Sequence, residues 1–260
     1  MVNISEGSRL DVVTAIAATA GRSLLDLHAD DHHNRSVLTL VGEDVPRAVA
    51  RAAVSSLDLR HHQGVHPRIG VVDVVPFAPL AGSTLADAVA ARDRFLAWLA
   101  DELAVPGFAY GPERSLPDVR RRAFRNLAPD AGPPRPHPTA GAAAVGARTV
   151  LVAWNVWLVE PNLARARQVA REIRGPQLRA LGLPMGERVQ VSMNLIEPDL
   201  LGPAEAWDLV AARVPVAGAE LVGLVPRSVL ERTDPDRWRA LDLAEDKTIE
   251  SRLARASSAG

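Results

Sequence analysis

The sequence contains no cysteine. This absence excludes disulfide bonds, thiolate nucleophiles and thiolate metal sites together, and it fits a protein that works in a reducing compartment. The apolar runs fall short of the roughly 18–20 residues that a membrane span needs. The first residues, MVNISEGSRLD, lack the basic and then apolar segments of a signal peptide. We therefore expect a soluble, cytoplasmic protein with no membrane partner.

An excess of charge of either sign is also missing. The 260 residues include 30 Lys and Arg against 31 Asp and Glu, a net charge of −1. No basic tract is interleaved with aromatic residues, so we do not expect a nucleic-acid partner. The contents of 47% hydrophobic and 23% charged residues are usual for a globular protein. A chain of this length can bury one large core or two small ones.

The hydrophobic periodicity alternates between helical and strand-like segments, in the same order in both halves of the chain. The first half predicts a helix at 8–22, strands at 23–30 and 34–42, a helix at 44–57 and a strand at 69–77. The second half predicts a strand at 148–159, a helix at 161–175, strands at 178–185 and 188–197, a helix at 203–214 and a strand at 219–225. The second half has the order βαββαβ. If a strand also precedes the helix at 8–22, the first half has the same order. This order predicts an α+β fold of two tandem ferredoxin-like subdomains, with helices packed on one face of each sheet.

Further helices are expected at 83–103 and 115–124, the first with a capping box between Thr84 and Asp87. We expect an N-terminal subdomain over 1–128, a proline-rich connector over 129–141, a C-terminal subdomain over 142–232 and a charged tail over 233–260. Because proline favours extended, semi-rigid backbone, the composition of the connector favours a stiff spacer over a wall of a ligand site.

Six of the seven histidines lie between His28 and His66, within the segments LHADDHHN and HHQGVHPRIG. A metal site is one interpretation, but Gly64 and Pro67 argue against a helix that would align His62 with His66. No tight ligand spacing such as HExxH occurs, so we expect no metal. The spacing leaves His61 and His62 as residues of a solvated loop.

His66 has a second interpretation as a catalytic base. Pro67 restricts its backbone, Arg68 can hold a carboxylate in a bidentate manner, and a buried strand follows. An imidazole on a loop can accept a proton at neutral pH. From spacing alone, a catalytic and a structural role of His66 are equally supported.

Several segments, taken in order, resemble the formiminotransferase domain of the formiminotransferase-cyclodeaminase family, and the resemblance covers residues 3 to about 232. They are NISEG (3–7), LLDLHADDHHNRSVLTLVG (24–42), HHQGVHPRIGVVDVVPFAPL (61–80), AGAAAVGARTVLVAWNVWL (140–158), QVSMNL (190–195) and ELVGLVP (220–226). The family transfers a formimidoyl group from N-formimidoyl-L-glutamate to N5 of tetrahydrofolate in histidine degradation, and its ligands lie between two ferredoxin-like subdomains. The resemblance therefore implies a one-carbon transferase with tetrahydrofolate as co-substrate and without a cyclodeaminase domain. It also implies a possible homodimer.

The resemblance assigns roles to particular residues. The histidine of the family's HPR motif is the catalytic base, which implies that role for His66. The family's folate-contacting segment matches the connector. The resemblance therefore implies that the connector lines the folate site, in place of the stiff spacer that its composition favours. The residues implied are Gly132, Pro133, Pro134, Arg135, Pro136, His137, Pro138, Thr139, Ala140 and Gly141. Arg35 and Arg68 are candidates to pair with substrate carboxylates, and Asn155, Ser192 and Asn194 to hydrogen-bond the pterin or the amidine; ordinary polar strand residues are the alternative for these three.

The chain also departs from the family pattern. Val65 stands where the family often has Glu, His28 where it has Asp, and Trp157 where it has Asn; Asp30 and Asp31 replace a Gly-Pro pair. These departures leave two alternatives to the formimidoyl-glutamate reaction. One is a paralogue that uses another donor, such as N-formyl-glutamate, and the other is a folate-binding protein without catalysis.

Overall fold

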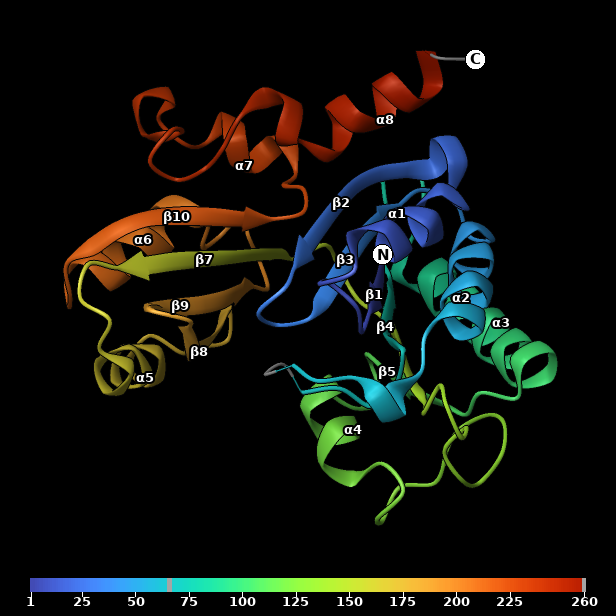
Figure 1. Cartoon of the computed structure of the whole chain (residues 1–260). Helices are drawn as coiled ribbons and strands as arrows, with labels where there is room; N and C mark the ends of the chain where they lie inside the picture. Colours follow the sequence, from blue (N-terminus) through green and yellow to red (C-terminus); the bar gives the residue numbers. More distant parts are fainter. Residues whose placement is uncertain (65–66, 259–260) are drawn as a thin grey trace. The chain divides into compact units, whose positions relative to one another are not determined.

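The computed structural model describes residues 1–64 and 67–258 (Figure 1). The chain forms two compact units, Met1–Thr149 and Val150–Gly260. Each unit is built on its own β-sheet, one of six strands and one of four, with helices packed alongside. The α+β class and the two tandem ferredoxin-like patterns predicted from the periodicity are confirmed.

The six-stranded sheet of the first unit begins as a ferredoxin-like sheet and is then extended. Its strands are β1 (Val2–Ile4), β2 (Leu24–Asp30), β3 (Arg35–Leu40), β4 (Val72–Phe77), β5 (Gly107–Tyr110) and β6 (Ala143–Ala147), in the order β2-β3-β1-β4-β6-β5. The first four are antiparallel, as expected for βαββαβ. β6 and β5 continue the sheet in parallel with β4, and neither was predicted from the periodicity.

The helices of the first unit cover both faces of its sheet. They are α1 (Leu10–Ala18), α2 (Val45–Ser56), α3 (Leu85–Leu103) and α4 (Leu116–Arg122). Apolar residues of α1, α2 and α3 share one core with the sheet, whereas α4 packs through Val119 against Phe108 and Tyr110 in a separate cluster on the other face. The helix α3 begins with the predicted capping box, in which the Thr84 hydroxyl accepts from the backbone of Asp87. One face of the sheet therefore carries α1, α2 and α3, and the other face carries α4, which was also predicted, against the added part of the sheet.

The second unit keeps the four-stranded pattern. Its elements are β7 (Val152–Leu158), α5 (Leu163–Glu172), β8 (Leu178–Met185), β9 (Arg188–Leu195), α6 (Pro203–Ala211), β10 (Val216–Val222), α7 (Arg227–Glu231) and α8 (Ile249–Ser258). All strand pairs are antiparallel and the order is β10-β7-β9-β8. Along β9, Val189, Val191 and Met193 enter the core, so the residues between them lie on the opposite face of the sheet.

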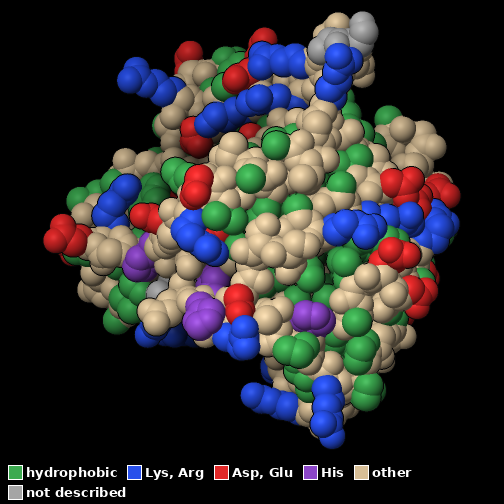
Figure 2. Space-filling model, turned by 45° about the vertical axis from the view of Figure 1, so that its right-hand side comes forward, with side chains coloured by type: hydrophobic (Ala, Val, Ile, Leu, Met, Phe, Trp, Pro, Cys, Tyr) green, Lys and Arg blue, Asp and Glu red, His purple; other side chains and the backbone are tan. Residues whose placement is uncertain are grey.

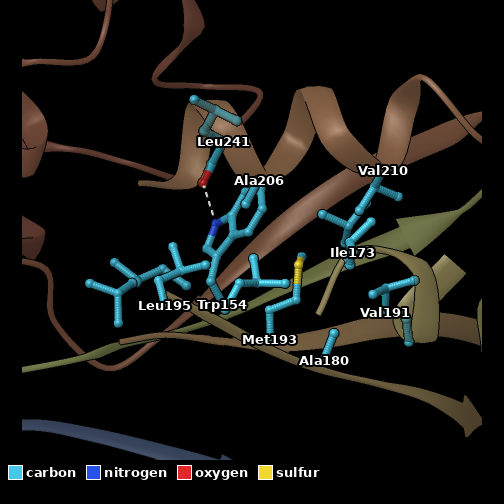
Figure 3. Close-up of a cluster of buried hydrophobic side chains, with 14 of the residues drawn as sticks. Trp154, Ile173, Ala180, Val191, Met193, Leu195, Ala206, Val210 and Leu241 are labelled. Atoms are coloured by element: carbon cyan, nitrogen blue, oxygen red, sulfur yellow. Dashed lines mark hydrogen bonds between the residues drawn. The ribbon is translucent and has the colours of Figure 1, made fainter. Parts of the chain in front are cut away.

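Trp154 lies at the centre of this second core, packed among side chains of the sheet and of α6 (Figure 3). Its indole Nε1 donates to the carbonyl of Leu241 over 3.0 Å, which satisfies the polar atom of a fully buried ring. Leu241 and Leu243 are themselves buried in the same cluster. Part of the segment 233–260, expected as a charged tail, is therefore integral to the second unit.

The division between the units also lies further along the chain than the expected start of the C-terminal subdomain at residue 142. Residues 142–149 pack with the first unit, because β6 hydrogen-bonds to β4 on one side and to β5 on the other. The connector 129–141 consequently belongs to the first unit rather than to a segment between the two. Within residues 1–64 and 67–258, no helix is long and apolar enough to cross a membrane.

The surface of the molecule mixes charges of both signs. On the face shown in Figure 2, Lys and Arg side chains alternate with Asp and Glu, and apolar side chains are scattered among them. The histidine side chains visible on this face gather in the lower half of the view.

Candidate active site

The connector is hydrogen-bonded to the segment that follows the HPR motif (residues 66–68). The Val71 amide donates to Ala140 O over 2.9 Å, and the Ala142 amide donates to Ile69 O over 2.9 Å. The chain just before the motif is attached as well, because the Leu59 amide donates to Thr139 O over 2.8 Å. His66 and Val65 lie outside the described residues. The structure therefore fixes the segments on either side of them against the segment that resembles the family's folate contact.

Two glycines allow this close approach. Gly70 and Gly141 form an isolated bridge, and Gly141 has φ +71°, a left-handed conformation. A Cβ at Gly141 would lie 2.4 Å from Ile69 O, and one at Gly70 would lie 2.0 Å from Ala142 O. Side chains at these positions would push the connector away from the segment after the motif.

We expect Gly141→Ala to lower the free energy of unfolding by more than the about 1–3 kcal/mol of left-handed strain alone, because the backbone must also separate. Gly186→Ala is the matched control, since Gly186 has φ +62° but nothing within 4 Å of an added Cβ; it should lose only roughly 1–2 kcal/mol. Urea unfolding of both variants measures the difference. Equal losses would show that the close approach contributes nothing.

A cavity of about 420 Å³ opens beside the connector. Its lining residues come from the connector, from the turn before the HPR motif, from Ile69 and from the end of α4. They are Leu59, Arg60, Ile69, Arg120, Ala123, Phe124, Arg125, Pro136, His137, Pro138 and Gly141. Three are arginines, and none of these described residues is acidic. The cavity is therefore suited to a ligand that carries carboxylates and apolar or aromatic surface.

His137 lines this cavity and is held by backbone hydrogen bonds. Its Nδ1 accepts from the backbone amides of Ala140, over 3.0 Å, and Thr139, over 3.3 Å. Because Nδ1 accepts, the neutral ring carries its proton on Nε2. The backbone of the connector thus holds the His137 ring and leaves its Nε2–H as a hydrogen-bond donor. The sequence pattern alone gave His137 no partner.

A buried carboxylate joins the segment after the HPR motif to two arginines. Asp73, on β4, is fully buried, and its Oδ2 accepts from Arg35 over 2.6 Å and from Arg120 over 2.7 Å. Its Oδ1 accepts from the Ile69 amide over 2.7 Å. Arg120 donates a further hydrogen bond to the carbonyl of Pro67, within the motif itself. The chain on the C-terminal side of the predicted catalytic histidine is therefore held by Asp73 and Arg120 together.

The charges in this cluster keep Asp73 ionised. Burial by itself would raise the pKa of Asp73, but the neighbouring guanidinium groups of Arg35 and Arg120 outweigh it and lower the pKa below its ordinary value. Arg35, proposed from the sequence as a carboxylate ligand, is thus occupied by a carboxylate of the protein itself. Arg120 belongs to both features, because it binds Asp73 and also lines the cavity.

The loop before the motif is ordered by internal hydrogen bonds. Arg68 donates to the carbonyls of Gly64 and His62, over 3.0 and 3.1 Å, so its guanidinium closes the loop. Asn34, at the β2–β3 turn, donates to Gln63 O over 2.7 Å and accepts from the Gly7 amide over 2.8 Å. The NISEG segment, the β2–β3 turn and the loop are thereby linked.

His61 and His62 differ, although both were predicted to be solvated. The side chain of His61 is 82% exposed, as predicted. His62 is half-buried and its Nε2 lies 2.8 Å from Asn34 O, so the prediction is wrong for His62. Burial lowers the pKa of His62 and the charge of Arg68 lowers it further, whereas the hydrogen bond to the carbonyl oxygen of Asn34 opposes both by raising it. The contact with Asn34, which is distant in sequence, decides this outcome.

The polar residues predicted on the second sheet share one of its faces. Asn155 on β7 is opposite Ser192 on β9, and Asn194 is opposite Ala153 in the next pair. Asn155 is buried and donates to Glu220 Oε2 over 3.0 Å, whereas Asn194 is exposed. The structure thus places these three residues together on the face that is turned away from the core.

Comparison with known proteins identifies the family. Residues 1–148 match the model of the formiminotransferase domain, N-terminal subdomain. Over 88% of its length the chain is 36% identical to the glutamate formimidoyltransferase of Streptococcus pyogenes serotype M1 and 32% identical to that of Thermoplasma acidophilum, covering 88% of each. It is 34% identical to the formimidoyltransferase-cyclodeaminase of Sus scrofa and covers 50% of that protein. The chain belongs to the formiminotransferase family.

Formimidoyl transfer is the activity that these names share, and the chain is a transferase of this family. Among the described residues of this formiminotransferase, no group of three or more His, Asp or Glu side chains is placed to hold a metal ion. The DDHH segment instead forms the end of β2 and the following turn, where Asp30 pairs with His33.

Sequence reasoning missed four residues of the candidate site: Asp73, Arg120, Arg60 and Arg125. One signal was present for Asp73, because a carboxylate within the apolar strand segment GVVDVVPF requires a partner when buried. The partners themselves are 38 and 47 residues away. No local pattern in the sequence indicates which of the three consecutive arginines Arg120–Arg122 turns towards Asp73.

Proposed function

We propose that this formiminotransferase transfers a formimidoyl group from N-formimidoyl-L-glutamate to N5 of tetrahydrofolate. The observation that carries the proposal is the attachment of the connector to the segment after the HPR motif, with a basic cavity beside both. The relatives named glutamate formimidoyltransferase support the donor. The connector residues Gly132–Gly141 would then contact the folate, and His66 would act as the catalytic base.

The reaction needs one group that moves a proton. The pterin N5 amine attacks the carbon of the formimidoyl group, which is most electrophilic when the amidine is protonated. As the new C–N bond forms, N5 loses a proton to the imidazole of His66. The imidazole then returns that proton to the glutamate nitrogen as the old C–N bond breaks, so that glutamate and 5-formimidoyltetrahydrofolate are released.

Binding must contribute much of the rate, because general base catalysis supplies only about 10²–10⁴-fold. Both substrates carry carboxylates, and we propose that the cavity arginine Arg125 pairs with a carboxylate of the folate, joined by Arg60 and Arg120 when these exchange their present partners Asp58 and Asp73. Arg35 and Arg68 stay proposed carboxylate contacts as well, and their guanidinium groups also hydrogen-bond to Asp73 and to backbone carbonyls. On the second sheet, Asn155, Ser192 and Asn194 remain proposed contacts of the pterin or the amidine.

A donor panel tests the function. Purified protein with tetrahydrofolate and N-formimidoyl-L-glutamate is expected to form 5-formimidoyltetrahydrofolate, detected by mass spectrometry together with released glutamate. Parallel reactions use N-formyl-L-glutamate and N-formimidoyl-glycine. Turnover with N-formyl-L-glutamate alone would replace the proposed donor, and tight tetrahydrofolate binding without turnover on any donor would contradict a catalytic role.

A further inference from the structure

A glutamine on the second sheet has an unsatisfied side chain. Gln190, on β9, has no exposed surface, and among residues 1–64 and 67–258 neither its amide oxygen nor its amide nitrogen has a hydrogen-bond partner. A buried polar group without a hydrogen bond destabilises the folded state, and such groups in native proteins commonly meet a water molecule or a ligand. The buried amide of Gln190 therefore points to a partner outside the described residues, such as a ligand.

The position of Gln190 on β9 shows on which face of the sheet its amide lies. Its neighbours Val189 and Val191 enter the core of the second unit, so Gln190 lies on the opposite face. Across the strands it is paired with Trp157 on β7 and Leu183 on β8. An indole and an aliphatic side chain thus flank the amide, and they offer apolar surface to a flat ring.

The same face carries a hydrogen-bonding row one pair further along the strands. Ser192 follows Gln190 on β9 and is opposite Asn155, which in turn is opposite Glu220 on β10. The Asn155 amide donates to Glu220, which orients the carboxylate. Across the strands the face therefore carries a hydroxyl, an amide and an acid in one row, and the Gln190 amide lies beside this row on β9.

We propose that Gln190 is a substrate-contacting residue whose amide recognises the edge of the pterin ring that carries adjacent C=O and N–H groups. An amide matches such an edge with two parallel hydrogen bonds, since Nε2–H donates to the carbonyl and Oε1 accepts from the N–H, in the way that amide side chains read a donor–acceptor pair on a nucleobase. The inference rests on the proposed use of tetrahydrofolate.

The site must open for this contact to form. Because the Gln190 amide is enclosed, side chains on this face have to move when the pterin binds. Arg188, two residues earlier on β9, is exposed and its guanidinium lies 3.8 Å from the centroid of the Trp157 ring. Exposed side chains change rotamer rapidly, and the ring of the pterin would take the place of the guanidinium beside the indole.

The test uses Gln190→Met, which keeps the shape and removes both polar atoms. Because an unsatisfied amide is removed, we expect the melting temperature to rise by about 2–4 °C, while the Kd for tetrahydrofolate, measured by calorimetry under reducing conditions, rises by about tenfold or more. Gln168→Met, on the exposed surface of α5, is the control and should change neither quantity.

Trp157 supplies a second measurement. Pterin binding next to Gln190 should quench tryptophan fluorescence in the wild type, and Trp157→Phe should lose that part of the quenching. A Gln190→Met protein that melts at lower temperature and binds tetrahydrofolate as tightly as the wild type overturns the proposal. An increase in the KM of the formimidoyl donor, with an unchanged Kd for tetrahydrofolate, also overturns it. A wild type that binds no tetrahydrofolate contradicts the proposed function instead, so the two failures are distinct.

Discussion

His66→Ala is expected to lower kcat for formimidoyl transfer by about 10²–10⁴-fold, the usual contribution of a general base. Alanine cannot take the proton that N5 releases, and no proton is then delivered to the departing glutamate nitrogen. Binding of tetrahydrofolate should change little, because the connector and the cavity arginines are left in place. Steady-state kinetics with N-formimidoyl-L-glutamate, together with a calorimetric Kd, separate the two effects.

His61→Ala is the matched control for this experiment. His61 is five residues upstream and its side chain is 82% exposed, so its removal should leave kcat within a factor of two or so, as for surface substitutions in general. The variants should have the same melting temperature as the wild type. Turnover by His66→Ala at the wild-type rate would remove His66 from the mechanism.

Asp73→Asn is expected to have the largest effect on stability, a loss of about 3–5 kcal/mol in the free energy of unfolding. Asparagine can still accept from the Ile69 amide, but it leaves Arg35 and Arg120 without the negative charge between them. The side chain of Arg35 is only 12% exposed, so water compensates little for the loss. We also expect transfer activity to fall, because Arg120 contacts the carbonyl of Pro67 in the HPR motif.

Urea unfolding measures this loss, with Glu43→Gln as the control. Glu43 pairs with Arg94 on the surface, where both side chains are more than a third exposed, and such pairs contribute about 0–1 kcal/mol. The pKa of Asp73 is lowered in the folded protein, so its contribution is complete above the unfolded value of 3.8 and is lost as the pH falls through the lower folded value. The difference between wild type and Asp73→Asn should therefore be constant near neutral pH and shrink in strong acid. A loss below 1 kcal/mol at pH 7 would show that the buried cluster is not stabilising.

The predicted elements that proved correct depend on local information. Helix and strand periods, the capping box at Thr84 and the polar turn between β2 and β3 all arise from residues a few positions apart. β6 was not predicted because its segment AAVGA is buried throughout and has no alternation of apolar and polar residues. Its small side chains are needed for packing: the Tyr110 ring occupies the space where a Cβ at Gly146 would lie.

By itself, the sequence determined the class of fold, the family and the order of the elements other than β5 and β6, because periodicity and motif order are properties of neighbouring residues. It also indicated the HPR motif and the connector as candidate site segments. In the tertiary structure the connector pairs with the segment after the motif through the bridge between Gly70 and Gly141. Only the tertiary structure decided which arginines bind Asp73, that His62 is half-buried, and that the Gln190 amide is enclosed with no partner in the described part of the chain. Those outcomes depend on burial and on contacts between residues far apart in the chain, and burial is what makes a charge or an amide require a partner.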